Sequence, residues 1–179
     1  MKRFAQGEEY QMAEQGTLQL YHGEKQTAIK LIKGFWKAHN NEDQTDAEAL
    51  KDLEAWTAEG HRFYFIRLAQ EFVGFLHLGN RGGKPDWIED VFVLPVYQNR
   101  GIGTSAIREA IQEIRSYAES VYIEAAARNQ GAIRLYRKLG FDCLNTVTLR
   151  HDFQAPNFEV LRTETIYDRE FEIRRKKQS

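Results

Sequence analysis

A glycine-containing stretch near the middle of the chain has the residue types and spacing of a phosphate-binding loop. Residues 98–104 read Gln-Asn-Arg-Gly-Ile-Gly-Thr, follow a strand-like run and open a helical pattern. Glycines let the backbone approach a ligand closely, and the free N–H groups and positive dipole end of a helix start favour phosphate. Arg100 adds positive charge. A glycine loop alone is a weak indication, and a plain tight turn into a helix is the alternative.

Two nucleotide-binding interpretations of this loop compete. Gly101 and Gly103, with Ala106 three residues later, fit the dinucleotide fingerprint, and Glu124 lies about 20 residues on, where a ribose-binding acid is expected. The context argues against this interpretation. The strand of the fingerprint should run directly into the first glycine, but here it ends near Val93 and residues 94–100 intervene. The chain also does not continue with further βαβ units.

The elements around the loop predict an α/β (α+β) protein with a mixed sheet and helices on its faces. Helical periodicity favours helices over residues 27–39, 46–59, 103–118 and 130–139, with Asp46 as an N-cap and Gly60 as a terminator. Strand-like runs cover 18–21, 61–68, 72–78, 87–93, 121–125 and 143–153, with one more within 158–173. Gln70-Glu71 is the expected hairpin turn between the second and third of these strands.

Two motifs together resemble the GNAT family of N-acetyltransferases. Gln98-x-x-Gly101-x-Gly103 looks like its pyrophosphate loop, Q/R-x-x-G-x-G/A, which follows the fourth strand. Residues 129–141 are similar to its second motif, N-x-x-A-x-x-x-Y-x-x-x-G-F, and residues 88–95 look like its fourth strand. The close match spans about residues 87–141, and a weaker order of elements covers about 18–153. The resemblance implies the GNAT fold, with a mostly antiparallel central sheet of about seven strands flanked by helices.

The resemblance also implies acetyl-CoA as cosubstrate, direct transfer of acetyl to a primary amine, and no metal. Strand backbone N–H groups would polarise the thioester carbonyl and pair with the pantetheine arm. Asn129 would contact the cofactor from the start of the last helix. The implied cofactor-binding residues are Val91, Phe92, Val93, Gln98, Asn99, Arg100, Gly101, Ile102, Gly103, Thr104 and Asn129.

Two adjacent carboxylates are the candidate bases. Deprotonating an amine with a pKa near 10.4 at pH 7 costs about 4–5 kcal/mol, and a nearby carboxylate can take that proton. Glu89 and Asp90 lie side by side in an apolar strand, so strand alternation predicts that one points to each face. Ile-Glu-Asp here resembles the diamine acetyltransferase branch, in which the Glu position is the proposed base. The alternative is that both carboxylates satisfy backbone at a strand end.

A phenol is the candidate acid. Tyr136 lies on the predicted helix 130–139, and the resemblance implies that it protonates the leaving thiolate. Packing against the apolar face of its own helix is the alternative. Cys143 is expected to be a buried strand residue without a base, which argues against a covalent acyl-enzyme. The five histidines show no metal-ligand spacing.

Composition bounds the other functions. Lys and Arg number 25 against 26 Asp and Glu, so the net charge of −1 excludes an overall basic nucleic-acid binder. One cysteine excludes an internal disulfide.

We expect a single GNAT domain over 18–173, an unassigned extension over 1–17 and a basic, solvated tail over 174–179. A polar N-terminus without an apolar run predicts a cytoplasmic protein with no membrane segment, and a homodimer stays open.

The acceptor is the least defined part of the prediction. In this family the first two helices form much of the acceptor side, where acidic residues outnumber the single Lys51. They are Glu42, Asp43, Asp46, Glu48, Asp52, Glu54 and Glu59. An acidic rim attracts cations, which favours a polyamine, an aminoglycoside-like compound or another small basic amine. Trp36 or Trp56 could stack on such a cation. A protein N-terminus or lysine, and a non-catalytic acyl-CoA sensor, are the alternatives.

Overall fold

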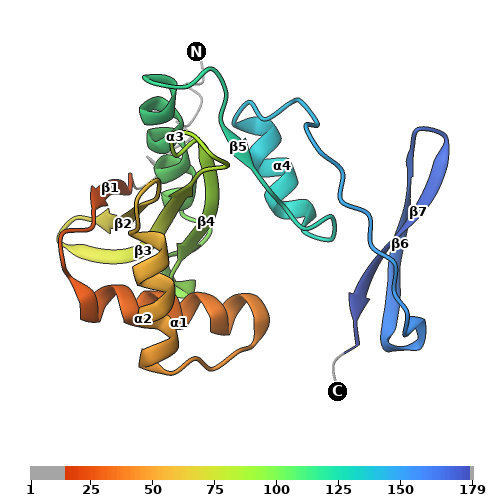
Figure 1. Cartoon of the computed structure of the whole chain (residues 1–179), viewed down its shortest axis with the longest axis horizontal. Helices are drawn as coiled ribbons and strands as arrows, with labels where there is room; N and C mark the ends of the chain where they lie inside the picture. Colours follow the sequence, from red (N-terminus) through yellow and green to blue (C-terminus); the bar gives the residue numbers. More distant parts are fainter. Residues whose placement is uncertain (1–14, 178–179) are drawn as a thin grey trace, which may run out of the picture. The chain divides into compact units, whose positions relative to one another are not determined.

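The computed structural model describes residues 15–177, so most of the predicted extension over 1–17 lies outside the described residues. The chain divides into two compact units, an N-terminal unit that ends at Ile123 and a C-terminal unit that starts at Glu124 (Figure 1). Each unit is described by itself below.

The N-terminal unit contains a five-stranded sheet. Its strands are β1 (Thr17–Leu20), β2 (Arg62–Leu68), β3 (Glu71–Gly79), β4 (Trp87–Val93) and β5 (Tyr122–Ile123). They lie in the order β1-β2-β3-β4-β5, antiparallel except for the parallel pair β4 and β5. The helices of this unit are α1 (Lys25–Asn40), α2 (Asp46–Trp56) and α3 (Ile102–Arg115). The predicted mixed, mostly antiparallel sheet flanked by helices is therefore confirmed.

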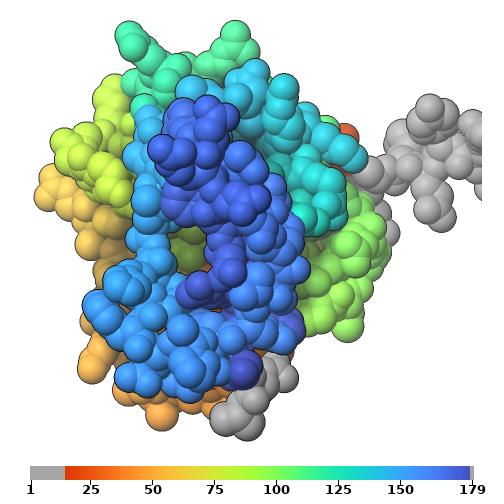
Figure 2. Space-filling model, turned by 90° about the vertical axis from the view of Figure 1, so that its right-hand side faces the viewer, coloured from red at the N-terminus to blue at the C-terminus, as the bar shows by residue number. Residues whose placement is uncertain are grey.

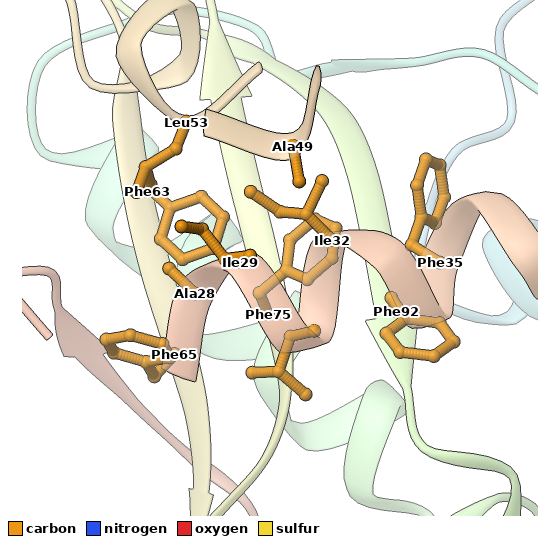
Figure 3. Close-up of a cluster of buried hydrophobic side chains, with 11 residues drawn as sticks. Ala28, Ile29, Ile32, Phe35, Ala49, Leu53, Phe63, Phe65, Phe75 and Phe92 are labelled. Atoms are coloured by element: carbon orange, nitrogen blue, oxygen red, sulfur yellow. The ribbon is translucent and has the colours of Figure 1, made fainter. Parts of the chain in front are cut away.

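The main core lies between the sheet and helices α1 and α2. Figure 3 shows aromatic rings from β2, β3 and β4 beneath aliphatic side chains of α1 and α2. Phe63 and Phe75 stack with centroids 5.0 Å apart, and Phe35 of α1 meets Phe75 edge-on at 5.6 Å. Such aromatic pairs add about 0.5–1.5 kcal/mol each to the burial of their area. This core fixes the backbone of β4, which carries the candidate site.

Helix α3 buries a continuous apolar stripe. Its buried residues are Ile102, Ala106, Ile107, Ala110 and Ile114, at the helical spacing predicted from the sequence. The helix contacts β1, β2 and β4, so its first turn is held near the end of β4.

Gly74 allows β3 and β4 to pair as closely as they do. A Cβ atom at Gly74 would lie 2.0 Å from the carbonyl oxygen of Phe92, a distance that no side chain tolerates. Gly74 pairs with Val93, and the N–H of Leu94 donates to the carbonyl of Val73 at 2.8 Å. The glycine therefore holds the C-terminal end of β4 in register, just before the predicted phosphate loop.

Local boundaries differ from the predictions in several places. Helix α2 ends at Trp56 and not at Gly60, because Thr57 caps it and its hydroxyl donates to the carbonyl of Leu53 at 2.7 Å. Helix α2 is capped by Thr45 and not by Asp46, because the hydroxyl of Thr45 accepts from the N–H of Glu48 while Glu48 accepts from the N–H of Thr45. The hairpin turn between β2 and β3 is Ala69-Gln70, since Glu71 already pairs with Leu68.

The C-terminal unit consists of one helix and one long hairpin. Helix α4 spans Gln130–Lys138, β6 spans Phe158–Ile166 and β7 spans Arg169–Lys176, with β6 and β7 antiparallel. Tyr167 and Asp168 form its turn, with φ of 50° and 58°, and the hairpin can be followed in dark blue in Figure 2. Two left-handed residues match the turn twist that tight hairpins require.

The sequence prediction was wrong for residues 143–153. This segment contains no strand, and Cys143 is exposed rather than buried. The alternation of Cys-Leu-Asn-Thr-Val-Thr-Leu has strand propensity, but a strand also needs a hydrogen-bonded partner, and the segment has none in the described part of the chain. Within residues 15–177, the strands are accordingly five in one sheet and two in a separate hairpin.

The basic run near the C-terminus is also not a tail. Arg174, Arg175 and Lys176 belong to strand β7. Arg174 forms ion pairs with Asp152 and Glu172, and Arg175 forms one with Glu159. The charges are therefore largely matched within the hairpin and its flank, and residues 178–179 lie outside the described residues.

Candidate active site

The predicted phosphate loop is a backbone nest at the start of α3. After β4 the chain makes a 3-10 turn over Pro95–Tyr97, and the side chain of Gln98 donates to the carbonyl of Val93 at 2.8 Å. Asn99 and Gly101 both take left-handed backbone angles, with φ of 60° and 85°. Gln98 therefore anchors the loop to β4 with its side chain, while the turn directs successive N–H groups to one side.

The first turn of α3 supplies free donors. The N–H of Ser105 donates to the carbonyl of Gly101 at 2.9 Å, which is the first intrahelical bond. The N–H groups of residues 102–104 precede it and have no intrahelical acceptor. Three such donors at the positive end of a helix dipole make an anion site.

The absence of a side chain at Gly103 is explained better by a bound ligand than by the needs of the fold. Its φ is not in the left-handed region, and a Cβ atom there would lie at an ordinary 3.5 Å from the Cγ2 atom of Val93. The fold itself therefore accepts a larger residue at this position. A bound pyrophosphate would not, because a side chain would separate it from the N–H donors.

Strands β4 and β5 separate after two residue pairs. Trp87 pairs with Tyr122 and Ile88 pairs with Ile123, and no further pairs join these strands. The rest of β4 is paired with β3 on one edge only within the described residues. The opposite edge, including Val91–Val93, thus keeps backbone donors and acceptors of the kind that an amide-containing pantetheine arm would use.

Both candidate bases point to the same face of the sheet, which corrects the prediction from strand alternation. His77 pairs with Asp90 and Leu78 pairs with Ile88, so Glu89 is an extra residue on β4. A β-bulge of this kind interrupts the alternation of side chains. A Cβ atom on Gly79 would lie 2.8 Å from the side chain of Glu89, so the carboxylate covers Gly79 on the His77 face of β3.

Glu89 is held by an arginine. Arg81 donates to both carboxylate oxygens of Glu89, and its guanidinium lies 4.3 Å from the ring centroid of Trp87. The side chain of Glu89 is 21% exposed. A bidentate pair of this geometry fixes the carboxylate and occupies one lone pair on each of its oxygens.

Asp90 is held by a histidine that sequence reasoning missed. The Nδ1 atom of His77 lies 3.0 Å from Oδ2 of Asp90, and its Nε2 atom lies 2.9 Å from Nδ1 of His61. His77 is only 3% exposed and stacks on Trp56 at 5.0 Å. The detectable signal was a histidine in an otherwise apolar strand, but its partners are 13 and 16 residues away.

The two predicted residues of the C-terminal unit have defined local roles. The side chain of Asn129 caps α4 by accepting from the N–H of Ala132 at 3.1 Å. Tyr136 packs edge-on against Phe141 at 5.9 Å. Burial raises the pKa of the Tyr136 phenol, so it stays protonated throughout the neutral range and is able to act as an acid.

Much of the predicted acidic rim is matched within α1, α2 and the loop between them. Lys33 pairs with Asp46 and Lys37 pairs with Asp43, each at 2.6 Å. Asp52 accepts from the indole N–H of Trp36 at 2.7 Å and from Gln44. Trp56 is half-buried and stacks on Phe63 and His77.

Among residues 15–177 no group of three or more His, Cys, Asp and Glu side chains is arranged to hold a metal ion. No helix in that range is long and apolar enough to cross a membrane.

Comparison with known families decides the classification. The chain matches the Acetyltransferase (GNAT) family over residues 28–141, more than half of its length. The chain belongs to the GNAT family. The matched region includes the phosphate loop, the β4 bulge and helix α4, so the resemblance carried by the two sequence motifs is confirmed.

Two of the relatives that the chain matches are N-alpha-acetyltransferases. The chain is 33% identical over 88 residues to the N-alpha-acetyltransferase RimI of Mycobacterium tuberculosis, covering 47% of this chain and 54% of that protein. It is 36% identical over 117 residues to an N-alpha-acetyltransferase of Sulfurisphaera tokodaii, covering 58% and 65%. The chain thus spans about half to two thirds of the length of these relatives.

Solved structures share the fold at low identity. AAC(6')-Iy, in complex with the bisubstrate analogue CoA-S-monomethyl-acetylneamine, has a TM-score of 0.60 at 18% identity, covering 75% of this chain and 96% of that one. The aminoglycoside acetyltransferase meta-AAC0020, from an uncultured soil metagenomic sample, has a TM-score of 0.59 at 20% identity, covering 75% and 93%. These likenesses support the fold alone.

Proposed function

We propose that this protein is an acetyl-CoA-dependent N-acetyltransferase that transfers acetyl directly to a primary amine. The observation that carries the proposal is the nest at the start of α3 beside the unpaired edge of β4. The N–H groups of residues 102–104 would bind the pyrophosphate, and β4 would bind the pantetheine arm and polarise the carbonyl. These two features supply what a long, amide-containing and phosphorylated cosubstrate requires.

The carboxylates of the bulge would handle the proton of the amine. Arg81 donates to both oxygens of Glu89, whereas His77 donates to one oxygen of Asp90 and leaves Oδ1 to accept a proton from the substrate amine. Asp90 is therefore the better placed base, although the family resemblance favours Glu89. In this assignment Glu89 contributes negative charge beside the incoming ammonium.

The chemical step then balances as follows. Asp90 takes a proton from the ammonium, and the free amine attacks the thioester carbonyl to form the C–N bond. The C–S bond breaks, and the family resemblance implies that the departing thiolate would take its proton from the phenol of Tyr136, a residue of the C-terminal unit. The raised pKa of that phenol keeps the proton available at neutral pH.

Two acceptor classes follow from different observations. A small cationic amine, such as a polyamine or an aminoglycoside-like compound, is supported by the two carboxylates on one face of β4. A protein N-terminal amine is supported by the relatives at 33% and 36% identity. The cytoplasmic location and a homodimer stay predictions from the sequence.

A thiol-release assay tests the proposal. The purified protein is incubated with acetyl-CoA and each of three acceptors, spermidine, an aminoglycoside and a short peptide with a free N-terminus, and free thiol is followed. Release that depends on one acceptor supports the transferase and selects the class. Tight acetyl-CoA binding without release by any acceptor would favour the acyl-CoA sensor instead.

A further inference from the structure

The region behind Asp90 contains two histidines in one hydrogen-bonded chain. His77 is the only polar side chain in the buried core of the described residues, and both of its ring nitrogens have partners. Burying an unsatisfied polar group costs about 1–3 kcal/mol, so these two bonds account for the tolerance of an imidazole there. The partners also determine where the protons are.

The carboxylate fixes the tautomer of His77. A carboxylate only accepts hydrogen bonds, so Nδ1 of His77 carries a proton and donates to Oδ2 of Asp90 at 3.0 Å. In the neutral ring Nε2 is then an acceptor, and Nδ1 of His61 donates to it across 2.9 Å. The order of donors therefore runs from His61 through His77 to Asp90.

The same geometry limits the pair to one extra proton. If His77 becomes an imidazolium, its Nε2 donates and Nδ1 of His61 must accept. Two imidazolium rings would point two N–H groups at each other across 2.9 Å, which is not a hydrogen bond. Burial, together with the nearby His77, lowers the pKa of His61.

Several charges face this pair. Glu89 of β4 and Arg81 of the loop between β3 and β4 act on His61 with opposite signs, and Asp90 faces His77. Trp56 of α2 covers His77 with an uncharged ring. His61 also lines an open pocket of about 400 Å³ with Tyr21, Thr57 and Arg62, which gives the pair a route for proton exchange with solvent.

We propose that His77 is the positioning residue for Asp90 and that the His61–His77 pair, by sharing one exchangeable proton, switches Asp90 between an ion-paired carboxylate and an active base. When the pair is protonated, the charge on His77 holds the proton-accepting carboxylate in an ion pair, so Asp90 removes a proton from the amine less readily. When the pair is neutral, His77 still orients Asp90 through its hydrogen bond, but no positive charge on His77 reduces the basicity of the carboxylate. This inference rests on the proposed transferase function.

The test combines a pH profile with variants that separate orientation from charge. In His77→Asn the amide nitrogen replaces Nδ1 and keeps the donor to Asp90 but cannot titrate. We expect kcat to stay within about threefold of wild type at high pH, and the acidic inflection contributed by the pair to disappear. In His77→Phe we expect kcat to fall by tenfold or more while the KM for acetyl-CoA is unchanged. His22→Gln, an exposed histidine, is the control and should leave the profile unaltered.

A second measurement does not depend on activity. In NMR titrations with 15N-labelled histidine, we expect Nδ1 of His77 to stay protonated throughout and the pair to take up a single proton, at a pH below the usual value for histidine because the pKa of His61 is lowered. Asp90→Asn should shift that titration to lower pH, because a stabilising negative charge is removed. If no amine is acetylated, the proposed function fails, and this titration still tests the coupled pair.

Three outcomes would overturn the inference. One is a His77→Phe enzyme that is folded by circular dichroism and has a wild-type rate and pH profile. A second is two separate titrations in which both rings become fully charged. The third is a pair whose titration ignores Asp90→Asn, because Asp90 would then not be coupled to it.

Discussion

In the proposed site, the two ends of the β4 region would bind by different means. Beyond the C-terminal end of the strand, the nest of residues 99–104 presents backbone N–H groups whose position follows from a turn and a helix start. Within the strand, Glu89 and Asp90 would act through side chains, each fixed by a partner from another element. A backbone site is insensitive to most substitutions except those that block access to it. A side-chain site depends on every partner that orients it.

The largest expected effect is at the backbone end. Gly103→Val should weaken acetyl-CoA binding by about 100-fold or more, because two lost charge-assisted hydrogen bonds at about 1.5–3 kcal/mol each account for that change. The melting temperature should change little, since a Cβ at Gly103 meets only Val93 at 3.5 Å. Calorimetric titration with acetyl-CoA and thermal melts measure the two quantities.

The matched control for that variant is Gly83→Val. Nothing lies within 4 Å of a Cβ at Gly83, and its φ is not left-handed. This control should bind acetyl-CoA as the wild type does. Normal binding by Gly103→Val would show that the nest is not the phosphate site, and measurable NADH binding by the wild type would revive the dinucleotide interpretation.

The next largest effect is expected at Tyr136, the proposed proton donor to the leaving thiolate. Tyr136→Phe should lower kcat by about 100-fold, the usual scale for a lost general acid, with acetyl-CoA affinity nearly unchanged. Any loss of the wild-type rate from phenol ionisation should begin at a higher pH than for an exposed tyrosine, because burial raises the pKa of Tyr136. Tyr167→Phe, an exposed tyrosine of the hairpin turn, is the control. An undiminished kcat would assign protonation to water or to another group.

A smaller effect separates the two carboxylates. Asp90→Asn should lower kcat at pH 7 by about tenfold or more and recover partly at high pH, where the free amine is abundant. Glu89→Gln should act mainly on the KM of a cationic acceptor, because Arg81 already occupies both oxygens of Glu89. Rates across pH 6–10 for both variants measure the difference. The reverse ranking would return the base to Glu89, as the family resemblance suggested.

The contrast between the two ends explains what the sequence could predict. The nest depends on residues that are adjacent in the chain, so Gln98, Gly101 and Gly103 indicated it directly. Helix α3 and the bounds of β4 were also predictable, since apolar periodicity is a local property. The bulge at Glu89 is not local. It arises from pairing with β3, and strand alternation alone therefore assigned the two carboxylates to opposite faces.

Long-range partners account for the other errors. His77 was treated as one of five histidines without metal spacing, because its partners His61 and Asp90 are joined to it only by the fold. Residues 143–153 were assigned a strand from propensity alone, although a strand exists only with a hydrogen-bonded neighbour. The acidic residues near α2 were counted as a rim before Lys33 and Lys37 were known to pair with them.

That pairing leads to the smallest expected effect. An unpaired acidic rim would steer a cationic acceptor, and the apparent KM would rise as salt screens charges beyond about 8–10 Å. Because Asp43 and Asp46 are paired with Lys37 and Lys33, we expect the KM to change by less than about twofold between about 50 and 200 mM salt. Lys37→Gln should release Asp43 and make the salt dependence steeper, as steady-state kinetics would measure. A steep dependence in the wild type would instead mean that the remaining acidic residues near α2 steer the acceptor despite these pairs. Attraction of the acceptor would then extend beyond the two carboxylates of β4.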